Sequence, residues 1–191
     1  GSTLAARGWT PHFLYGGYGM FDNMNGYFDA QGYQVTDRTN FQEGLVKFEN
    51  IWGVADEHLF DQALINLDKE AATGKPFFFH IMTTSNHRPF TYPDGRIDIP
   101  SGSGRAGAVK YTDWALRHLF ETARAKPWFK DTVFVVVADH CAGSAGKVAL
   151  PLERYRIPLM IYGKNVAPAR IETIASQIDV ARARLARKGL D

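Results

Sequence analysis

The sequence contains a single cysteine, Cys141, among 191 residues, so no disulfide can form within the chain. No apolar run approaches the roughly eighteen residues that a membrane-spanning helix requires. The formal net charge is only +2, which gives no reason to expect nucleic acid or an acidic membrane surface as the main partner. The chain also lacks the sequence motifs of serine hydrolases, phosphate-loop NTPases and dinucleotide-binding enzymes.

The composition is that of an ordinary soluble globular protein, with 45% hydrophobic and 22% charged residues. A length of 191 residues is enough for one domain with a sizeable core. We therefore expect a single domain, and the search for function turns to individual motifs.

The most informative stretch is Val133–Val137, in which five apolar β-forming residues follow one another. Such a run is typical of a strand buried on both faces of a parallel sheet that helices cover. It ends at Asp139 and His140, two residue types that bind metals, at the edge where open α/β sheets bind ligands. Small residues over 141–146 permit the turn that would bring both side chains to one ion. The alternative for Asp139 is an ordinary turn residue or helix cap.

A second apolar run, Phe77–Met82, also ends in a polar loop, which contains His87 and Arg88. These two side chains can hold an anionic oxygen. Parallel strands end along one edge of a sheet, so we expect this loop to meet Asp139 and His140 there. The alternatives are a histidine bonded to the local backbone and a solvent-facing arginine.

Apolar periodicity predicts the remaining elements. Asp22 and Asn23 fall at the start of one predicted helix, where capping is their default role. The alternation of strands and helices predicts an α/β three-layer α/β/α sandwich with a mainly parallel sheet. Further strands are expected over 11–15, 33–35, 157–162 and 171–174, and helices over 21–30, 54–72, 106–124 and 178–188. His80 is expected to be a core histidine, and His12, His58 and His118 are expected to be structural or exposed.

Taken together, the motifs resemble the lipoteichoic acid synthase-like sulfatases of the alkaline phosphatase superfamily, in particular a Gram-negative phosphoglycerol transferase-like branch. The resemblance extends over about residues 11–180 and implies an alkaline phosphatase-like fold. The matching segments are YGGYGMFDNM at 15–24, WGVADE at 52–57, SNHRPF at 85–90, YTD at 111–113, VADH at 137–140 and YRIP at 155–158.

The resemblance implies a reaction in which a threonine attacks a phosphate or sulfate ester of a cell-envelope lipid or glycan. A divalent metal ion assists, with manganese as the first expectation and magnesium, zinc or calcium as alternatives. The family holds this ion with a glutamate, the threonine and an Asp-His pair. The resemblance implies His87 as the residue that binds the substrate phosphate. The candidate substrate-binding residues are thus His87, Asp22, Asn23 and Arg88, and the candidate metal ligands are Asp139 and His140.

Two departures from the family pattern matter. Asp22 and Met24 stand where the synthases have tryptophan and arginine, so specificity for lipid-linked phosphoglycerol does not follow. The family's glutamate and threonine precede the 15–24 motif, and Thr83 and Thr84 lack the nucleophile's context. We therefore expect residues 1–191 to be the C-terminal part of one catalytic domain, incomplete at its N-terminal side and without a catalytic nucleophile.

This expectation has consequences for the protein as a whole. By family resemblance, the full-length protein would be anchored in the inner membrane, with its catalytic domain on the periplasmic or extracellular side. The 191-residue piece itself would be soluble, inactive alone and prone to self-association. The alternative is a catalytically inactive module that binds an anionic lipid or glycan.

Overall fold

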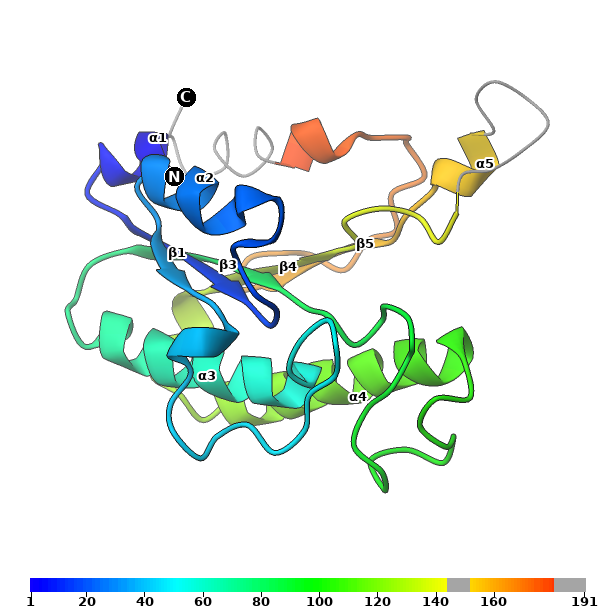
Figure 1. The fold of residues 1–191 in the computed structure, drawn as a ribbon. Coiled ribbons are helices and arrows are strands. Elements are labelled where there is room, and N and C mark those ends of the chain that lie inside the picture. Colours follow the sequence, from blue (N-terminus) through cyan, green and yellow to red (C-terminus); the bar gives the residue numbers. More distant parts are fainter. Residues whose placement is uncertain (144–151, 181–191) are drawn as a thin grey trace. The chain divides into compact units, whose positions relative to one another are not determined.

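The computed structural model describes residues 1–143 and 152–180 (Figure 1). The chain divides into two compact units, an N-terminal unit, Gly1–Lys130, and a C-terminal unit, Asp131–Asp191. Within the described residues, no helix is both long enough and apolar enough to cross a membrane.

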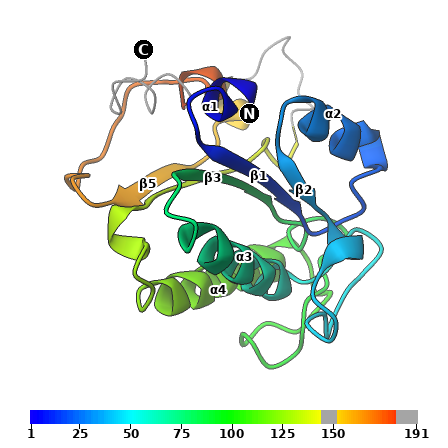
Figure 2. The same ribbon diagram turned by 90° about the vertical axis from the view of Figure 1, so that its left-hand side faces the viewer.

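The N-terminal unit is built on a three-stranded parallel sheet with the strand order β2-β1-β3. Helices α1 and α2 lie on one face of this sheet, and the longer helices α3 and α4 lie on the other (Figure 2). This arrangement confirms the predicted three-layer sandwich. Its elements are α1 (Ser2–Ala5), β1 (Thr10–Tyr15), the 3₁₀ turn η1 (Phe21–Asn23), α2 (Met24–Ala30), β2 (Gln34–Thr36), η2 (Arg38–Asn40), α3 (Asp56–Ala71), β3 (Phe77–Met82), α4 (Arg105–Ala123) and η3 (Phe129–Asp131).

The core of this unit lies between the sheet and helix α3. Leu59 and Ala63, one helical turn apart on α3, are fully buried against Leu14 of β1 and Val54. Asp56 and Glu57 occupy the first turn of α3, where the helix dipole favours negative charge. The apolar stripe predicted over 54–72 thus places this helix against the sheet.

The C-terminal unit contains the strands β4 (Val133–Val137) and β5 (Leu159–Gly163) and the short helix α5 (Leu152–Tyr155) between them in sequence. The two strands pair antiparallel, with Val135 opposite Ile161. Residues 177–180 are helical, and the remainder of the helix predicted over 178–188 lies outside the described residues. The turn expected over 141–146 is described only as far as Gly143.

Three sequence-based expectations were wrong. Strand β4 is half-buried and pairs antiparallel, because the apolar β-forming residues that favour a strand do not decide what covers it. The segment 171–174 forms no strand. His80 is exposed at the surface of β3 instead of lying in the core, with its ring edge-on to Phe13 and Phe28.

Candidate functional site

The carboxyl ends of two neighbouring strands form one edge of the N-terminal unit's sheet. Tyr15 at the end of β1 is the register partner of Met82 at the end of β3. The glycine turn Gly16–Gly17 follows one strand, and the polar loop that carries His87 follows the other. The parallel pairing therefore brings two of the candidate site segments to the same edge.

Asp56 anchors the polar loop from the first turn of α3. Its Oδ1 accepts hydrogen bonds from the backbone N–H groups of Thr84, at 3.1 Å, and Ser85, at 3.0 Å. Its Oδ2 accepts a hydrogen bond from the Thr112 hydroxyl at 2.8 Å, and its own N–H donates to Ser85 Oγ at 3.0 Å. Asp56 is fully buried. Burial raises the pKa of this carboxyl, and the hydrogen bonds from Ser85, Thr112 and Thr84 oppose the rise.

Sequence reasoning missed this role, because an acidic residue in a first helical turn is already explained by the helix dipole. The available signal was the position of Asp56 within the matching segment at 52–57.

His87 lies exposed on the anchored loop. Its Nδ1 is 3.0 Å from the carbonyl oxygen of Arg88, and since a carbonyl only accepts, Nδ1 is the donor. Nε2 is then the ring nitrogen left for a ligand. The imidazole also packs on the indole of Trp52, with ring centroids 3.9 Å apart and an interplanar angle of 41°. Arg88, the next residue, is exposed.

Asp22 and Asn23 lie in η1, directly after the glycine turn. Both have left-handed backbone conformations, with φ of 51° and 56°, and neither side chain makes a capping hydrogen bond. Neither side chain therefore takes the default capping role, and a helix-capping residue ordinarily has an extended backbone. Both residues are exposed. The preceding Phe21 ring meets Trp52 edge-on, with centroids 5.8 Å apart, so this segment and His87 contact the same tryptophan.

Asp37 holds the turn that leads to this segment. It is buried, and its carboxylate accepts hydrogen bonds from the N–H of Gly19, the amide of Asn25, and the N–H and hydroxyl of Thr39. Burial alone would raise the pKa of Asp37. The hydrogen bonds from Thr39, Asn25 and Gly19 outweigh burial and hold the pKa below its usual value.

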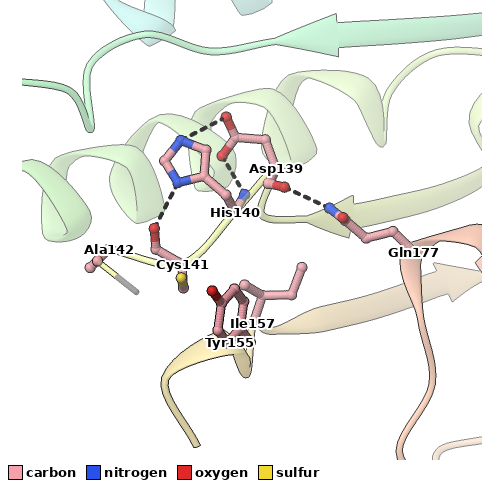
Figure 3. Close-up of a pocket in the computed structure, with 8 residues that line it drawn as sticks. Asp139, His140, Cys141, Ala142, Tyr155, Ile157 and Gln177 are labelled. Carbon is pink, nitrogen blue, oxygen red and sulfur yellow. Dashed lines mark hydrogen bonds and ion pairs between the residues drawn. The ribbon is translucent and has the colours of Figure 1, made fainter. Parts of the chain in front are cut away.

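Asp139 and His140 line a pocket of about 410 Å³ in the C-terminal unit (Figure 3). Asp139 Oδ1 accepts the His140 N–H at 2.8 Å, and His140 Nδ1 donates to the Cys141 carbonyl at 2.6 Å. Nε2 of His140 then lies 3.4 Å from Oδ2 of Asp139. Gln177 donates from Nε2 to the carbonyl oxygens of Ala138 and Asp139, at 2.9 and 2.8 Å. The remaining lining residues are Ala142, Gly143, Tyr155 and Ile157.

The geometry of this pair fits part of a metal site. Two ligand atoms, each about 2.1 Å from a tetrahedrally coordinated ion, lie about 3.4 Å apart. Asp139 Oδ2 and His140 Nε2 have this spacing, and the Nδ1 bond to a carbonyl is the outer contact that metal-binding histidines usually make. Over residues 1–143 and 152–180, no group of three or more histidine, cysteine, aspartate or glutamate side chains is placed to hold an ion. The pair therefore provides two ligands of a site that normally needs three or four.

The predicted meeting of His87 with Asp139 and His140 joins residues of two different units and stays a prediction. Each unit separately presents a histidine with Nδ1 bonded to the carbonyl of the following residue, which leaves Nε2 of His87 open and Nε2 of His140 facing Asp139 Oδ2. This common arrangement suits ligand binding through Nε2 at both places.

The family model described as Sulfatase matches residues 1–189 of the chain. Phosphoglycerol transferase I of Xanthomonas campestris pv. campestris is 24% identical over 185 residues, which cover 92% of this chain and 26% of that protein. Lipoteichoic acid synthase 2 of Bacillus subtilis is 22% identical over 209 residues, which cover 98% of this chain and 32% of that protein. The chain thus spans less than a third of the length of these curated relatives.

The fold also matches that of a solved structure. A crystal structure of a protein in the alkaline phosphatase superfamily from Vibrio parahaemolyticus superposes with a TM-score of 0.93 at 35% identity. The match covers 100% of this chain and 47% of the other. The alkaline phosphatase-like fold implied by the sequence motifs is confirmed.

Proposed function

This chain belongs to the sulfatase family, and on that basis we propose that the full-length protein is a metal-dependent phosphoglycerol transferase. Its substrates would be phosphate esters of cell-envelope lipids or glycans, with a phosphoglycerol group transferred. The names of the relatives, phosphoglycerol transferase and lipoteichoic acid synthase, support this reaction class over sulfate ester hydrolysis. We also propose that the protein is anchored in the inner membrane with its active site on the periplasmic or extracellular side.

The observation that carries the proposal is the Asp139-His140 pair, whose ligand atoms have the 3.4 Å spacing of two donors to one ion. A divalent ion held there, manganese first, would act as a Lewis acid on the ester oxygens. The Cys141 carbonyl fixes the ring of His140, and Gln177 fixes the backbone that carries Asp139. We propose that a segment outside these 191 residues would supply the further ligands, a glutamate and the threonine nucleophile.

The substrate phosphate is assigned to the edge of the N-terminal sheet. In its imidazolium form, His87 donates from Nδ1 to the Arg88 carbonyl and from Nε2 to a ligand, so Nε2 and the exposed Arg88 guanidinium can both bind the non-bridging phosphate oxygens. The side chains of Asp22 and Asn23 are exposed and make no capping hydrogen bond, so they can hydrogen-bond the hydroxyl groups of glycerol.

The test is a transfer assay on the full-length protein with phosphatidylglycerol as donor, measuring release of diacylglycerol, the leaving group of the transfer, with and without Mn²⁺. Asp139→Asn and His140→Gln should abolish Mn²⁺-dependent turnover, because each removes a ligand. His87→Gln should lower kcat/KM by about 100-fold, as expected for the loss of one phosphate-binding donor. His118→Gln is the matched control, since His118 bonds Asp61 at 2.8 Å between α3 and α4 and has no assigned role in catalysis.

Wild-type activity in His87→Gln or Asp139→Asn would overturn the assignment of the site. A full-length protein that binds glycerol 1-phosphate yet turns over no phosphoglycerol ester would instead favour a catalytically inactive binding module.

A further inference from the structure

Trp52 touches both candidate substrate-binding segments of the N-terminal unit. One neighbour is the imidazole of His87, at a centroid distance of 3.9 Å, and the other is the ring of Phe21, at 5.8 Å and 90°. Phe21 directly precedes Asp22 and Asn23. A single half-buried side chain thus links two segments that are more than sixty residues apart in sequence.

Trp52 is itself held firmly. Its N–H donates to Asn50 Oδ1 at 2.8 Å, and the amide of Asn50 donates to Thr91 Oγ1 at 3.0 Å, beyond the His87 loop. Its carbonyl oxygen lies against the glycine turn, where a Cβ added to Gly17 would come within 2.5 Å of it. Trp52 is therefore fixed to both the end of β1 and the chain that follows β3.

The imidazole of His87 needs a packing partner to keep one orientation. The side chain is exposed, and its bond from Nδ1 to the Arg88 carbonyl restrains one ring nitrogen. An aromatic face packed against the ring limits the remaining rotation through contact along the imidazole. The two contacts together point Nε2 in one direction before any ligand arrives, which reduces the entropy lost on binding.

We propose that Trp52 is a positioning residue that holds the His87 imidazole, and through Phe21 the 22–23 segment, in the geometry that binds the substrate phosphate. This inference rests on the proposed function, in which His87 contacts the phosphate. Trp52 does not touch the reacting atoms and acts through His87.

The test measures binding of glycerol 1-phosphate to the full-length protein by calorimetry. Trp52→Leu should raise Kd about tenfold, whereas Trp52→Phe, which keeps an aromatic face, should recover most of the affinity. In a His87→Gln background, Trp52→Leu should change Kd by no more than about threefold, because only the 22–23 segment then depends on Trp52. In the transfer assay, Trp52→Leu should raise KM about tenfold and leave kcat within twofold.

Trp114→Leu is the matched control. Trp114 forms the other tryptophan-histidine stack described in this unit, with His118 at 6.0 Å and 4°, on helix α4. Its removal should leave Kd and KM unchanged even if the melting temperature falls as much as in Trp52→Leu. If Trp52→Leu fails to fold, Trp52→Met, which keeps bulk without an aromatic face, takes its place in both His87 backgrounds.

The outcomes separate the two proposals. A wild-type protein that neither binds glycerol 1-phosphate nor transfers phosphoglycerol overturns the proposed function and this inference with it. If the wild-type protein does both, two results would overturn this inference alone. One is a Trp52→Leu variant with the wild-type Kd, and the other is an equal rise in Kd from Trp52→Leu in the wild-type and His87→Gln backgrounds.

Discussion

The buried carboxylate of Asp56 holds the loop after β3 in place without contacting a substrate. It receives three hydrogen bonds, from Thr84, Ser85 and Thr112, and so ties the loop after β3 to helices α3 and α4. A buried donor that loses its acceptor costs about 1–3 kcal/mol. The loop that presents His87 therefore depends on one residue of α3.

Replacing Asp56 by alanine should lower the free energy of unfolding by about 3 kcal/mol or more, because three donors lose their acceptor together. Urea denaturation measures this change. Asp29→Ala, at an exposed position of α2, is the control and should change stability by less than about 0.5 kcal/mol. Equal effects of the two substitutions would contradict the anchoring role.

The hydrogen bonds of Asp37 predict how the stability of the fold changes with pH. Its hydrogen bonds hold its folded-state pKa below the unfolded value near 3.8. Ionised Asp37 therefore stabilises the fold above the unfolded pKa, and this contribution is lost as the pH falls through the folded pKa. The stability difference between wild type and Asp37→Asn should be constant above about pH 5 and shrink below about pH 4.

Urea denaturation at a series of pH values tests this expectation. Thr39→Val removes one hydroxyl donor and keeps the carboxylate, so it should move the acid-induced loss to higher pH. A difference between wild type and Asp37→Asn that does not vary from pH 3 to pH 7 would refute the expectation.

At the scale of elements, the segment before α3 passes close to the ends of β1 and β3. The N–H of Val54 donates to the Gly16 carbonyl at 2.9 Å, and the Thr84 hydroxyl donates to the Val54 carbonyl at 3.1 Å. A Cβ on Gly53 would lie 2.4 Å from the Gly16 oxygen and 2.7 Å from Thr84 Oγ1. Only glycine fits where these three segments meet.

Gly53→Ala should therefore cost about 1–3 kcal/mol, because backbone atoms cannot move aside easily. It should also weaken glycerol 1-phosphate binding, since it displaces the neighbouring Trp52. The comparison variant is Gly95→Ala, where φ is +76° but nothing lies within 4 Å of the added Cβ. That variant should lose stability through backbone strain alone and keep its affinity, and a matching affinity loss there would count against the argument.

At the scale of the whole molecule, the strand β5 exposes apolar side chains on consecutive residues. An exposed apolar strand tends to associate with other chains. The large exposed side chains are Leu159 at 42%, Met160 at 58%, Ile161 at 45% and Tyr162 at 48%.

We expect the purified 191-residue chain to self-associate through this strand. Light scattering over a concentration series should show a mass above that of the monomer, and the double variant Met160→Lys with Ile161→Thr should lower it. Ile51→Thr, a change at a large exposed side chain of the N-terminal unit, is the control. A monomeric wild type at high concentration would show that β5 needs no partner.

The local pattern of the chain determined most of the elements and the family. The helix expected over 54–72 is α3, Asp56–Ala71, and the strand expected over 11–15 is β1, Thr10–Tyr15. These succeeded because the 3.6-residue period of the helix and the short apolar run of β1, which is buried on both faces, are properties of neighbouring residues. The motifs that indicate the family are likewise short and contiguous.

Tertiary structure alone decided which residues support those motifs and which faces are covered. Asp56 meets Thr112 across 56 positions, and Trp52 meets His87 across 35, through the packing of α3 and α4 on the sheet and the parallel pairing of β1 with β3. Nothing in the local sequence encodes these partners. That β4 is only half-buried was missed for the same reason, because strand propensity resides in the residues themselves whereas burial depends on what packs against them.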